Sequence, residues 1–315
     1  MTKPRVGRTL DEMADWIRNL RDAGDILRRA KNPAELAKAL VPNAWLTRRV
    51  INLDAPRSSG PVSAADAAEA LRKLGNALKS EVIGADGQVD YAKLQSSETF
   101  AELERTSSLL HHVDPEQLTE DDARIAFWIN VYNVLAIHGV VATGVRESVM
   151  EIPSFFGVVA YRVGDFVVTL DEIENGILRR NAPHPATKSR LFDDDDPRLA
   201  LCPSYVDPRI HAALVCASTS CPPVAFYEAG RLDEQLDLAA DNYVATDVEV
   251  DDSAKLIRLP ITFRYYESDF GRRAGVQLFL LKHAAGPQRQ ALRAAFDAGY
   301  ALDYHRYDWS LNAMA

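Results

Sequence analysis

The chain has 315 residues, of which 47% are hydrophobic and 26% are charged, and its formal net charge is −9 at pH 7. These proportions are typical of a soluble globular protein with enough apolar residues for a buried core. The acidic balance argues against nucleic acid or an anionic membrane as the main partner, because both attract basic surfaces.

The N-terminal sequence MTKPRVGRTLDEMADW has early positive charges but no apolar segment behind them, so it does not resemble a signal peptide. No run of about 18 apolar residues predicts a membrane span. We therefore expect a cytoplasmic protein, in which thiols stay reduced. The three cysteines, Cys202, Cys216 and Cys221, include no CxxC pair and form no disulfide framework.

The first part of the chain is predicted to be helical. Residues 9–55 have the spacing of two or three amphipathic helices, residues 54–63 have the composition of a loop, and a helical pattern resumes at 64–82. We expect an N-terminal helical region at 1–90 and a second region at 91–315.

The strongest helical pattern in the sequence spans 119–144, after a shorter predicted helix at 97–113. Thr119 is the expected N-cap, because acidic residues fill the next turn, where the helix dipole favours them. The interior is apolar nearly all round, so this helix is expected to lie at the centre of the core.

Extended segments are predicted in the second half of the chain. Residues 157–170 predict a hairpin around a Gly-Asp turn, and 209–216 predict a strand after a polar loop. A second hairpin is expected at 247–260, and helices at 171–181 and 231–245. Two further helical stretches finish the chain. The pattern favours an α+β fold that is rich in helices and has a small antiparallel sheet.

The segment DPRIHAALVCASTSCPPV, residues 207–224, places His211, Cys216 and Cys221 within eleven residues. In a regular strand His211 and Cys216 lie on opposite faces, whereas Cys221 follows in a turn that can fold back over the strand end. A histidine beside such a thiol is a workable nucleophile pair, because an imidazolium lowers the pKa of the thiol. Simple packing of buried cysteines stays an alternative.

A metal site is another alternative, because histidine and cysteine are soft ligands. Their spacing here differs from that of structural zinc pairs, and a fourth ligand is not evident. We therefore expect neither a metal nor a cofactor.

Polar residues also interrupt the apolar helix. Asn130 and Asn133 share one face, and because buried amides need partners, they either clasp neighbouring loops or line a site. His138 is expected to be a satisfied core histidine. Glu174 and Arg179 lie five residues apart, a spacing that fits no simple salt bridge on one helix, so we expect one of them to pair outside it.

Four blocks of the sequence resemble the family called domain of unknown function 547: AFWINVYN, TLDEIENGILR, DPRIHAALVCASTSCPP and YDWSLN. The resemblance covers about residues 95–312 and makes the second region a family core with a C-terminal helical extension. It implies that members carry the same residue types at His211, Cys216, Cys221, Asn130, Glu174 and Arg179.

Two departures from the family pattern affect the interpretation. Asn175 stands where members often have histidine, and plant members resemble a pattern with serine in place of Cys221, which favours Cys216 as the family thiol. A helical body with a His/Cys pair is also loosely similar to papain-like and transglutaminase-like hydrolases, at the level of fold.

The leading hypothesis is a thiol-dependent hydrolase or acyltransferase that acts on a peptide or a small amide. Cys221 or Cys216 would attack, His211 would act as base, and Glu174 or Asn130 would orient the imidazole. An N–H group of the 217–221 loop would stabilise the oxyanion. The expected substrate contacts are Arg179, Asn133 and Ser220.

The competing hypothesis is a non-catalytic scaffold or binding module. In that case the Asn, His and Cys side chains form a structural polar network, and the N-terminal helices bind a protein partner. A metal-binding protein is the third alternative.

Overall fold

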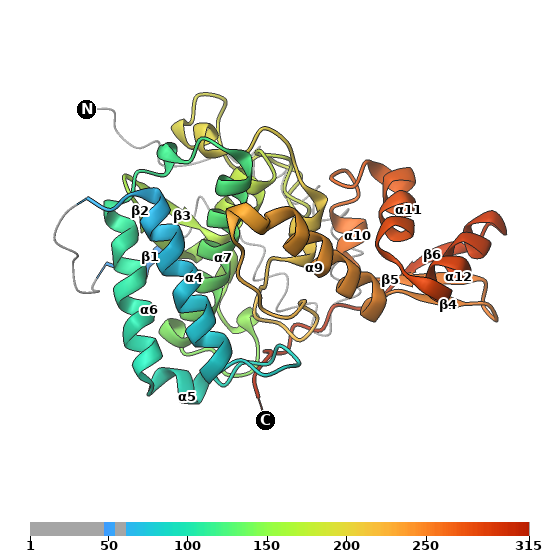
Figure 1. Cartoon of the computed structure of the whole chain (residues 1–315), viewed down its shortest axis with the longest axis horizontal. Coiled ribbons are helices and arrows are strands. Elements are labelled where there is room, and N and C mark those ends of the chain that lie inside the picture. The colour runs from blue at the N-terminus through green and yellow to red at the C-terminus, as the bar shows by residue number, and fades with distance from the viewer. Residues whose placement is uncertain (1–46, 54–60, 315) are drawn as a thin grey trace, which may run out of the picture.

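Helices dominate the structure, and its strands form two small three-stranded sheets (Figure 1). The computed structural model describes residues 47–53 and 61–314. Most of the helices predicted within 9–55 therefore lie outside the described residues. The predicted α+β class is confirmed.

The central helix of the body is α7, Asp121–Thr143. Every residue from Ile125 to Val140 is buried, because an apolar surface on all sides of a helix needs neighbours in all directions. The helix is long and apolar enough to cross a membrane, but 89% of its apolar window is buried inside the protein. The N-cap is Glu120 rather than the predicted Thr119, and it makes no side-chain cap hydrogen bond.

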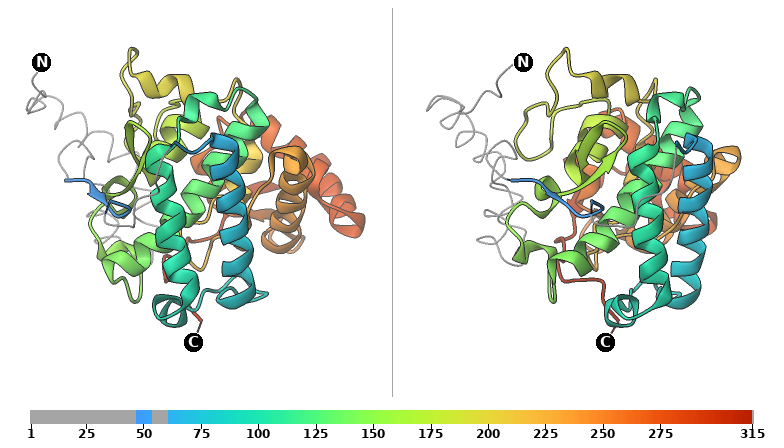
Figure 2. Two further views of the ribbon diagram at one scale, coloured as in Figure 1. Left: turned by 60° about the vertical axis from the view of Figure 1, so that its left-hand side comes forward. Right: turned by 90° about the vertical axis from the view of Figure 1, so that its left-hand side faces the viewer.

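Three helices cover α7 on one side: α4 (Ala64–Glu81), α5 (Tyr91–Gln95) and α6 (Glu98–Leu109). Helices α4 and α6 run side by side (Figure 2), and α4 also packs against α7. Ser63 caps α4 by accepting a hydrogen bond from the N–H of Asp66. Leucines of α4 belong to the same hydrophobic cluster as α7. Over the described residues, the predicted region 1–90 therefore shares one core with the rest of the body.

The first sheet has the order β1-β2-β3, with strands Arg49–Val50, Val159–Val163 and Phe166–Thr169. The β2-β3 hairpin confirms the prediction for 157–170. Its turn requires glycine, because Gly164 has a φ of 56° and an added Cβ would lie 2.3 Å from a backbone oxygen. β1 runs parallel to β2.

Short helices connect these elements. They are α8 (Phe155–Val158), the π-helix η5 (Glu172–Leu178), and the 3-10 helices η2 (Leu110–His112), η3 (Pro115–Gln117), η4 (Val149–Glu151), η6 (Pro197–Leu201), η7 (Pro208–Ala212) and η8 (Ala229–Arg231). A capping box precedes the η5 segment, since Thr169 and Glu172 exchange hydrogen bonds between side chain and backbone N–H.

A smaller C-terminal unit has its own hydrophobic cluster. Its elements are β4 (Glu249–Asp251), β5 (Leu256–Leu259), α10 (Thr262–Tyr265), α11 (Arg272–His283), α12 (Gly286–Asp297) and β6 (Ala301–Tyr304). The β4-β5 hairpin is confirmed, and β6 joins β5 in parallel. Both sheets are therefore mixed rather than antiparallel. The parallel strands come from distant segments, which local sequence patterns do not reveal.

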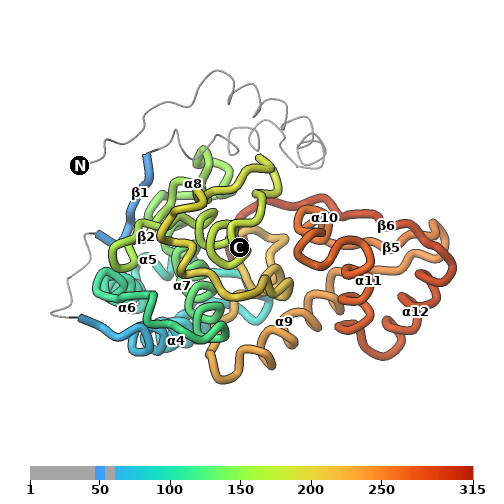
Figure 3. The backbone as a smooth tube through the Cα atoms, turned by 90° about the horizontal axis from the view of Figure 1, so that it is seen from above, coloured from blue at the N-terminus to red at the C-terminus, as the bar shows by residue number. Residues whose placement is uncertain are grey.

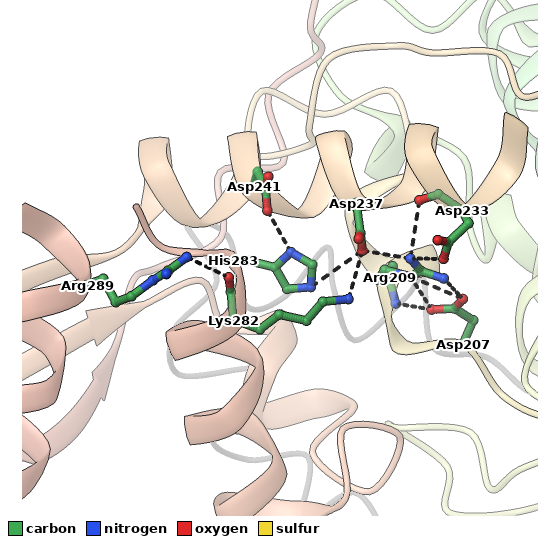
Figure 4. Close-up of polar contacts among 8 residues, drawn as sticks. All are labelled: Asp207, Arg209, Asp233, Asp237, Asp241, Lys282, His283 and Arg289. Carbon is green, nitrogen blue, oxygen red and sulfur yellow. Dashed lines mark hydrogen bonds and ion pairs between the residues drawn. The ribbon is translucent and has the colours of Figure 1, made fainter. Parts of the chain in front are cut away.

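Helix α9, Leu232–Asp247, joins the two parts: its first half contributes to the body's core and its second half to the C-terminal cluster. A charged network links η7, α9 and α11 (Figure 4). Arg209 of η7 and Lys282 of α11 contact the same carboxylate, that of Asp237 on α9, at 2.7 and 2.9 Å. The other members drawn are Asp207, Asp233, Asp241, His283 and Arg289.

The predicted strand at 209–216 is wrong. Residues Pro208–Ala212 form η7, and an irregular segment follows. Asp207 begins the 3-10 turn by accepting a hydrogen bond from the N–H of Arg209 at 2.9 Å, and the N–H of Val215 donates to the side chain of Asn133 at 2.9 Å. The segment is apolar because it is buried, and a short buried run has no periodicity that identifies a strand.

The end of the chain returns from the C-terminal unit to the body (Figure 3). Here the N–H of Thr219 donates to the carbonyl of Ser310 at 2.8 Å, and the N–H of Asn312 donates to the carbonyl of Ala217 at 3.1 Å. This returning segment, residues 305–314, is called the C-terminal tail below. It lies directly on the loop that carries the two candidate thiols.

Candidate functional site

The structure brings the two candidate nucleophiles together. The Sγ atoms of Cys216 and Cys221 lie 2.7 Å apart, and both residues are free cysteines with partial exposure. The connecting loop is held by a hydrogen bond of 3.0 Å from the N–H of Cys221 to the carbonyl of Ser218. Ala217 has a φ of 63°, a left-handed conformation that few residues other than glycine adopt.

Hydrogen-bond donors converge on the sulfur of Cys221. The N–H of Cys216 donates to it at 3.1 Å, and the hydroxyl oxygens of Ser218 and Tyr307 each lie 3.3 Å away. Burial raises the pKa of Cys221, but hydrogen bonds from Cys216, Ser218 and Tyr307 outweigh it and lower the pKa to about 6. A thiolate is the species that such donors stabilise.

Cys216 has the opposite protonation. Burial and the neighbouring sulfur of Cys221 raise the pKa of Cys216 well above its usual value, so it keeps its proton and can donate to Cys221. Its sulfur also lies 3.0 Å from the Tyr307 hydroxyl. The two cysteines therefore form a thiolate–thiol pair, which we call the dithiol.

Tyr307 is a site residue that the sequence reasoning missed. Its hydroxyl oxygen contacts both sulfurs and lies 3.0 Å from the Ser218 hydroxyl oxygen. Burial raises the pKa of Tyr307 well above its usual value, so the hydroxyl keeps its proton. Tyr307 opens the block YDWSLN, and the presence of that block among the four family blocks is the signal that pointed to it.

The structure does not bring His211 to either sulfur. Its Nε2 lies 2.9 Å from a carboxylate oxygen of Asp269, and its ring stacks on Tyr266 with the centroids 4.0 Å apart. In the predicted strand, His211 would have preceded a turn that folds Cys221 back over the strand end. In η7 it instead faces the C-terminal unit, so the predicted Cys–His pair is not formed.

Asp269, rather than Glu174 or Asn130, orients the imidazole. Asp269 also accepts two hydrogen bonds from the guanidinium of Arg179, one of them at 2.9 Å. Burial raises the pKa of Asp269, but hydrogen bonds from His211 and Arg179 outweigh it, so the pKa lies well below its usual range. Sequence reasoning missed Asp269 because it lies 58 residues from His211.

Arg179 does pair outside its own helix, as its spacing from Glu174 predicted. Only 1% of its surface is exposed, so its guanidinium is committed to Asp269 and to Asn175, whose side-chain oxygen lies 2.7 Å away. The proposed substrate contact is therefore replaced by a buried ion pair. The π-helix places Arg179 here, because its N–H bonds to the carbonyl of Glu174, five residues back, at 2.9 Å.

Tyr132 of α7 lies near Glu174 and the dithiol. Its hydroxyl donates to Glu174 at 3.3 Å. Burial raises the pKa of Tyr132 well above its usual value, and the negative charges of Glu174 and Cys221 add to the increase. Glu174 and the dithiol are therefore both near this buried phenol.

The two asparagines of α7 clasp neighbouring loops. Asn130 exchanges hydrogen bonds of 2.7 and 2.8 Å with the backbone of Tyr227. Asn133 donates to the carbonyls of Ala213 and Ala225, both at 3.0 Å, and accepts from Val215. Of the two alternatives, the structural one is realised, and neither amide contacts His211.

The loop around Ser220 is also engaged in structural contacts. The Ser220 hydroxyl accepts a hydrogen bond of 2.8 Å from the N–H of Asp308. The N–H groups of Thr219, Ser220 and Cys221 all donate to carbonyl oxygens. The predicted oxyanion donor is therefore not among these three N–H groups, because each already has an acceptor.

Within residues 47–53 and 61–314, no group of three or more His, Cys, Asp or Glu side chains is arranged to hold a metal ion. The dithiol places a thiolate in contact with a second thiol. In general, a thiolate can attack an electrophilic carbon, and a pair of thiols can exchange electrons with an oxidant.

No curated protein and no solved structure matches the chain significantly, and the likeness to papain-like or transglutaminase-like hydrolases stays a prediction. Residues 115–244 match a family described as "Protein of unknown function, DUF547". This segment contains α7, the π-helix, His211 and both thiols of the dithiol, whereas Asp269 and Tyr307 lie beyond it. The resemblance to the DUF547 family is therefore confirmed for this segment.

Proposed function

We propose that the protein is a thiol-dependent acyl-transfer enzyme in which Cys221 is the nucleophile. The observation that supports this most directly is the convergence of donors from Cys216, Ser218 and Tyr307 on the Cys221 sulfur. This environment favours a thiolate at neutral pH, and a thiolate is the reactive form of cysteine. Cys221 is partly exposed, and the proposal requires that a small substrate reaches its sulfur.

In the proposed reaction the Cys221 sulfur attacks the acyl carbon, and a thioester forms as the bond to the leaving group breaks. The acylated sulfur carries no negative charge, so the repulsion that keeps the proton on Cys216 disappears. Cys216, 2.7 Å away, then gives its proton to the leaving group. Water or an acceptor amine returns a proton to Cys216 as it attacks the thioester. This route assigns no step to His211.

Alkylation by iodoacetamide across pH, followed by peptide mass spectrometry, tests the nucleophile. We expect half-maximal reaction of Cys221 near pH 6, as its pKa of about 6 requires. Cys202 is a control within the same chain, because burial raises its pKa to about 11 and its thiol donates to a backbone carbonyl at 3.4 Å. Reaction of Cys221 with the profile of a free thiol, with a pKa of about 8.5, contradicts the proposal.

Acyl transfer itself is tested with p-nitrophenyl acetate as a generic acyl donor. We expect a burst of nitrophenol and an acetyl adduct on Cys221. Cys221→Ser should lose both, while Cys202→Ser should keep both. An acetyl adduct on no cysteine, or the same burst from Cys221→Ser, would overturn the proposed activity.

A scaffold role is the second candidate, and the clasps made by Asn130 and Asn133 favour it. These amides connect α7 to the loops before and after the dithiol, as a structural polar network would. In that case the acyl donor should label no cysteine, and Asn133→Ala should affect only the stability of the fold.

A further inference from the structure

We propose that Cys216 and Cys221 are a redox modification site, at which a peroxide converts the two thiols into a reversible intrachain disulfide. The inference goes beyond the acyl-transfer proposal and does not depend on it. It rests on the placement of the two sulfurs, on the loop that holds them, and on their different surroundings.

The distance between the sulfurs is the first argument. At 2.7 Å they need to approach by only about 0.7 Å to reach the length of a disulfide bond. Four residues separate the cysteines in the sequence, so both are carried by one short loop. Formation of the bond therefore requires local side-chain movement rather than movement of whole elements.

The loop is fixed on the body independently of the sulfurs. The C-terminal tail bonds to its backbone at Ala217 and Thr219, and an isolated β-bridge joins Ser218 to Leu311. The turn from Ser218 to Cys221 closes the loop. These contacts hold the two side chains face to face before any oxidant arrives, which lowers the entropic cost of closing the ring.

The two sulfurs have complementary roles in the oxidation. The Cys221 thiolate attacks one oxygen of hydrogen peroxide, the O–O bond breaks, and after protonation a sulfenic acid and one water form. The Cys216 sulfur then attacks the sulfenic sulfur, the S–O bond breaks, and a second water leaves with the proton of Cys216. In total the two thiols lose two electrons and two protons to one peroxide molecule.

Cys202 provides the contrast within the same protein. It is partly exposed, but its thiol donates to the carbonyl of Gly176, and burial raises its pKa. It has no sulfur partner among the described residues. The same dose of peroxide should therefore leave Cys202 as a thiol.

The test uses the full chain at neutral pH with hydrogen peroxide as the oxidant. After treatment the protein is denatured, the remaining thiols are alkylated, and trypsin releases residues 199–209 and 210–231 as separate peptides. We expect 210–231 to lose two hydrogens and to take no label, while 199–209 takes one label. Dithiothreitol should restore both labels on 210–231.

Two variants make the outcome decisive. Cys202→Ser should form the disulfide as the wild type does. Cys216→Ser has no second thiol, so Cys221 should accumulate as a sulfenic acid that dimedone traps. Sulfinic acid on Cys221 of the wild type with Cys216 still alkylated would overturn the inference. So would disulfides between two chains, or two free thiols on 210–231 after peroxide treatment. Each readout is a peptide mass, so a failed acyl-transfer assay does not affect it.

Discussion

His211 and Asp269 share a hydrogen bond of 2.9 Å although 58 residues separate them. The DUF547 segment ends at residue 244, so its histidine receives its carboxylate from the C-terminal unit. The same carboxylate neutralises Arg179, which also lies inside the segment. The C-terminal unit therefore supplies the carboxylate that pairs with two residues of the 115–244 segment, His211 and Arg179.

Replacement of Asp269 by asparagine should destabilise the protein strongly. It leaves the buried guanidinium of Arg179 without its counter-charge, and breaking a buried ion pair on one side typically costs about 3–5 kcal/mol. Urea denaturation at pH 7 measures the loss. Asp297→Asn, at an exposed position of α12, is the matched control and should change the free energy of unfolding by less than about 0.5 kcal/mol.

The effect of Asp269 should also depend on pH. Its folded-state pKa is lowered, so its stabilisation is present above the unfolded value of about 3.9 and is lost as pH falls below that value. The difference in unfolding free energy between wild type and Asp269→Asn should therefore stay constant from pH 7 to about 5 and narrow as pH falls from about 4 towards 3. A difference that stays constant down to pH 3 would show that Asp269 acts through its shape rather than its charge.

The free energy of unfolding should also depend on pH through His138, in a higher pH range than for Asp269. It is buried, its Nδ1 lies 2.8 Å from the Tyr161 hydroxyl, and burial lowers its pKa to about 4. The unfolded chain, with a histidine pKa of about 6.5, binds the proton first, so stability falls as pH drops from about 6.5 to 4, by about 3 kcal/mol from this residue. The free energy of unfolding of His138→Gln, measured between pH 7 and 4, should lack this decrease. His305→Gln, at an exposed position, should follow the wild type.

Removal of the Asn133 amide should loosen the segment that leads to the dithiol. Asn133→Ala deletes three hydrogen bonds and leaves two carbonyls and the N–H of Val215 without their partner. We expect a loss of about 2–4 kcal/mol, since buried polar groups without partners are costly. Urea denaturation measures it, and Asn242→Ala on the exposed face of α9 is the control. Equal midpoints for the two variants would contradict the structural role of the clasp.

Strong periodicity made most helices predictable. The patterns at 64–82, 97–113, 119–144 and 231–245 correspond to α4, α6, α7 and α9. In α4, α6 and α9 the buried positions recur at helical spacing, whereas α7 is a long segment that is apolar on all sides. Both hairpins were predictable because the two strands of each hairpin are neighbours in the sequence. The parallel strands β1 and β6 were not, because their partners lie far away along the chain.

The candidate site was predictable only in part. Cys216 and Cys221 lie five residues apart, so their proximity follows from one short turn. Asp269 and Tyr307 reach the site from the C-terminal unit and from the tail, and local spacing carries no information on such contacts. The segment 209–216 was misjudged because Asn133 satisfies its backbone, a role that strand neighbours would otherwise fill.

Tyr307→Phe should make Cys221 less reactive. The substitution removes one hydroxyl that stabilises the thiolate, at 3.3 Å, and keeps the ring that packs on Trp309. The pKa of Cys221 should rise towards the usual value, so alkylation of Cys221 at pH 6 should slow several-fold while the rate at high pH stays the same. Mass spectrometry across pH measures this profile. Tyr300→Phe, whose hydroxyl bonds to Asp252 in the C-terminal unit, is the control. If both variants keep the wild-type profile, the Tyr307 hydroxyl does not set the protonation of Cys221, and the tail serves only to hold the loop.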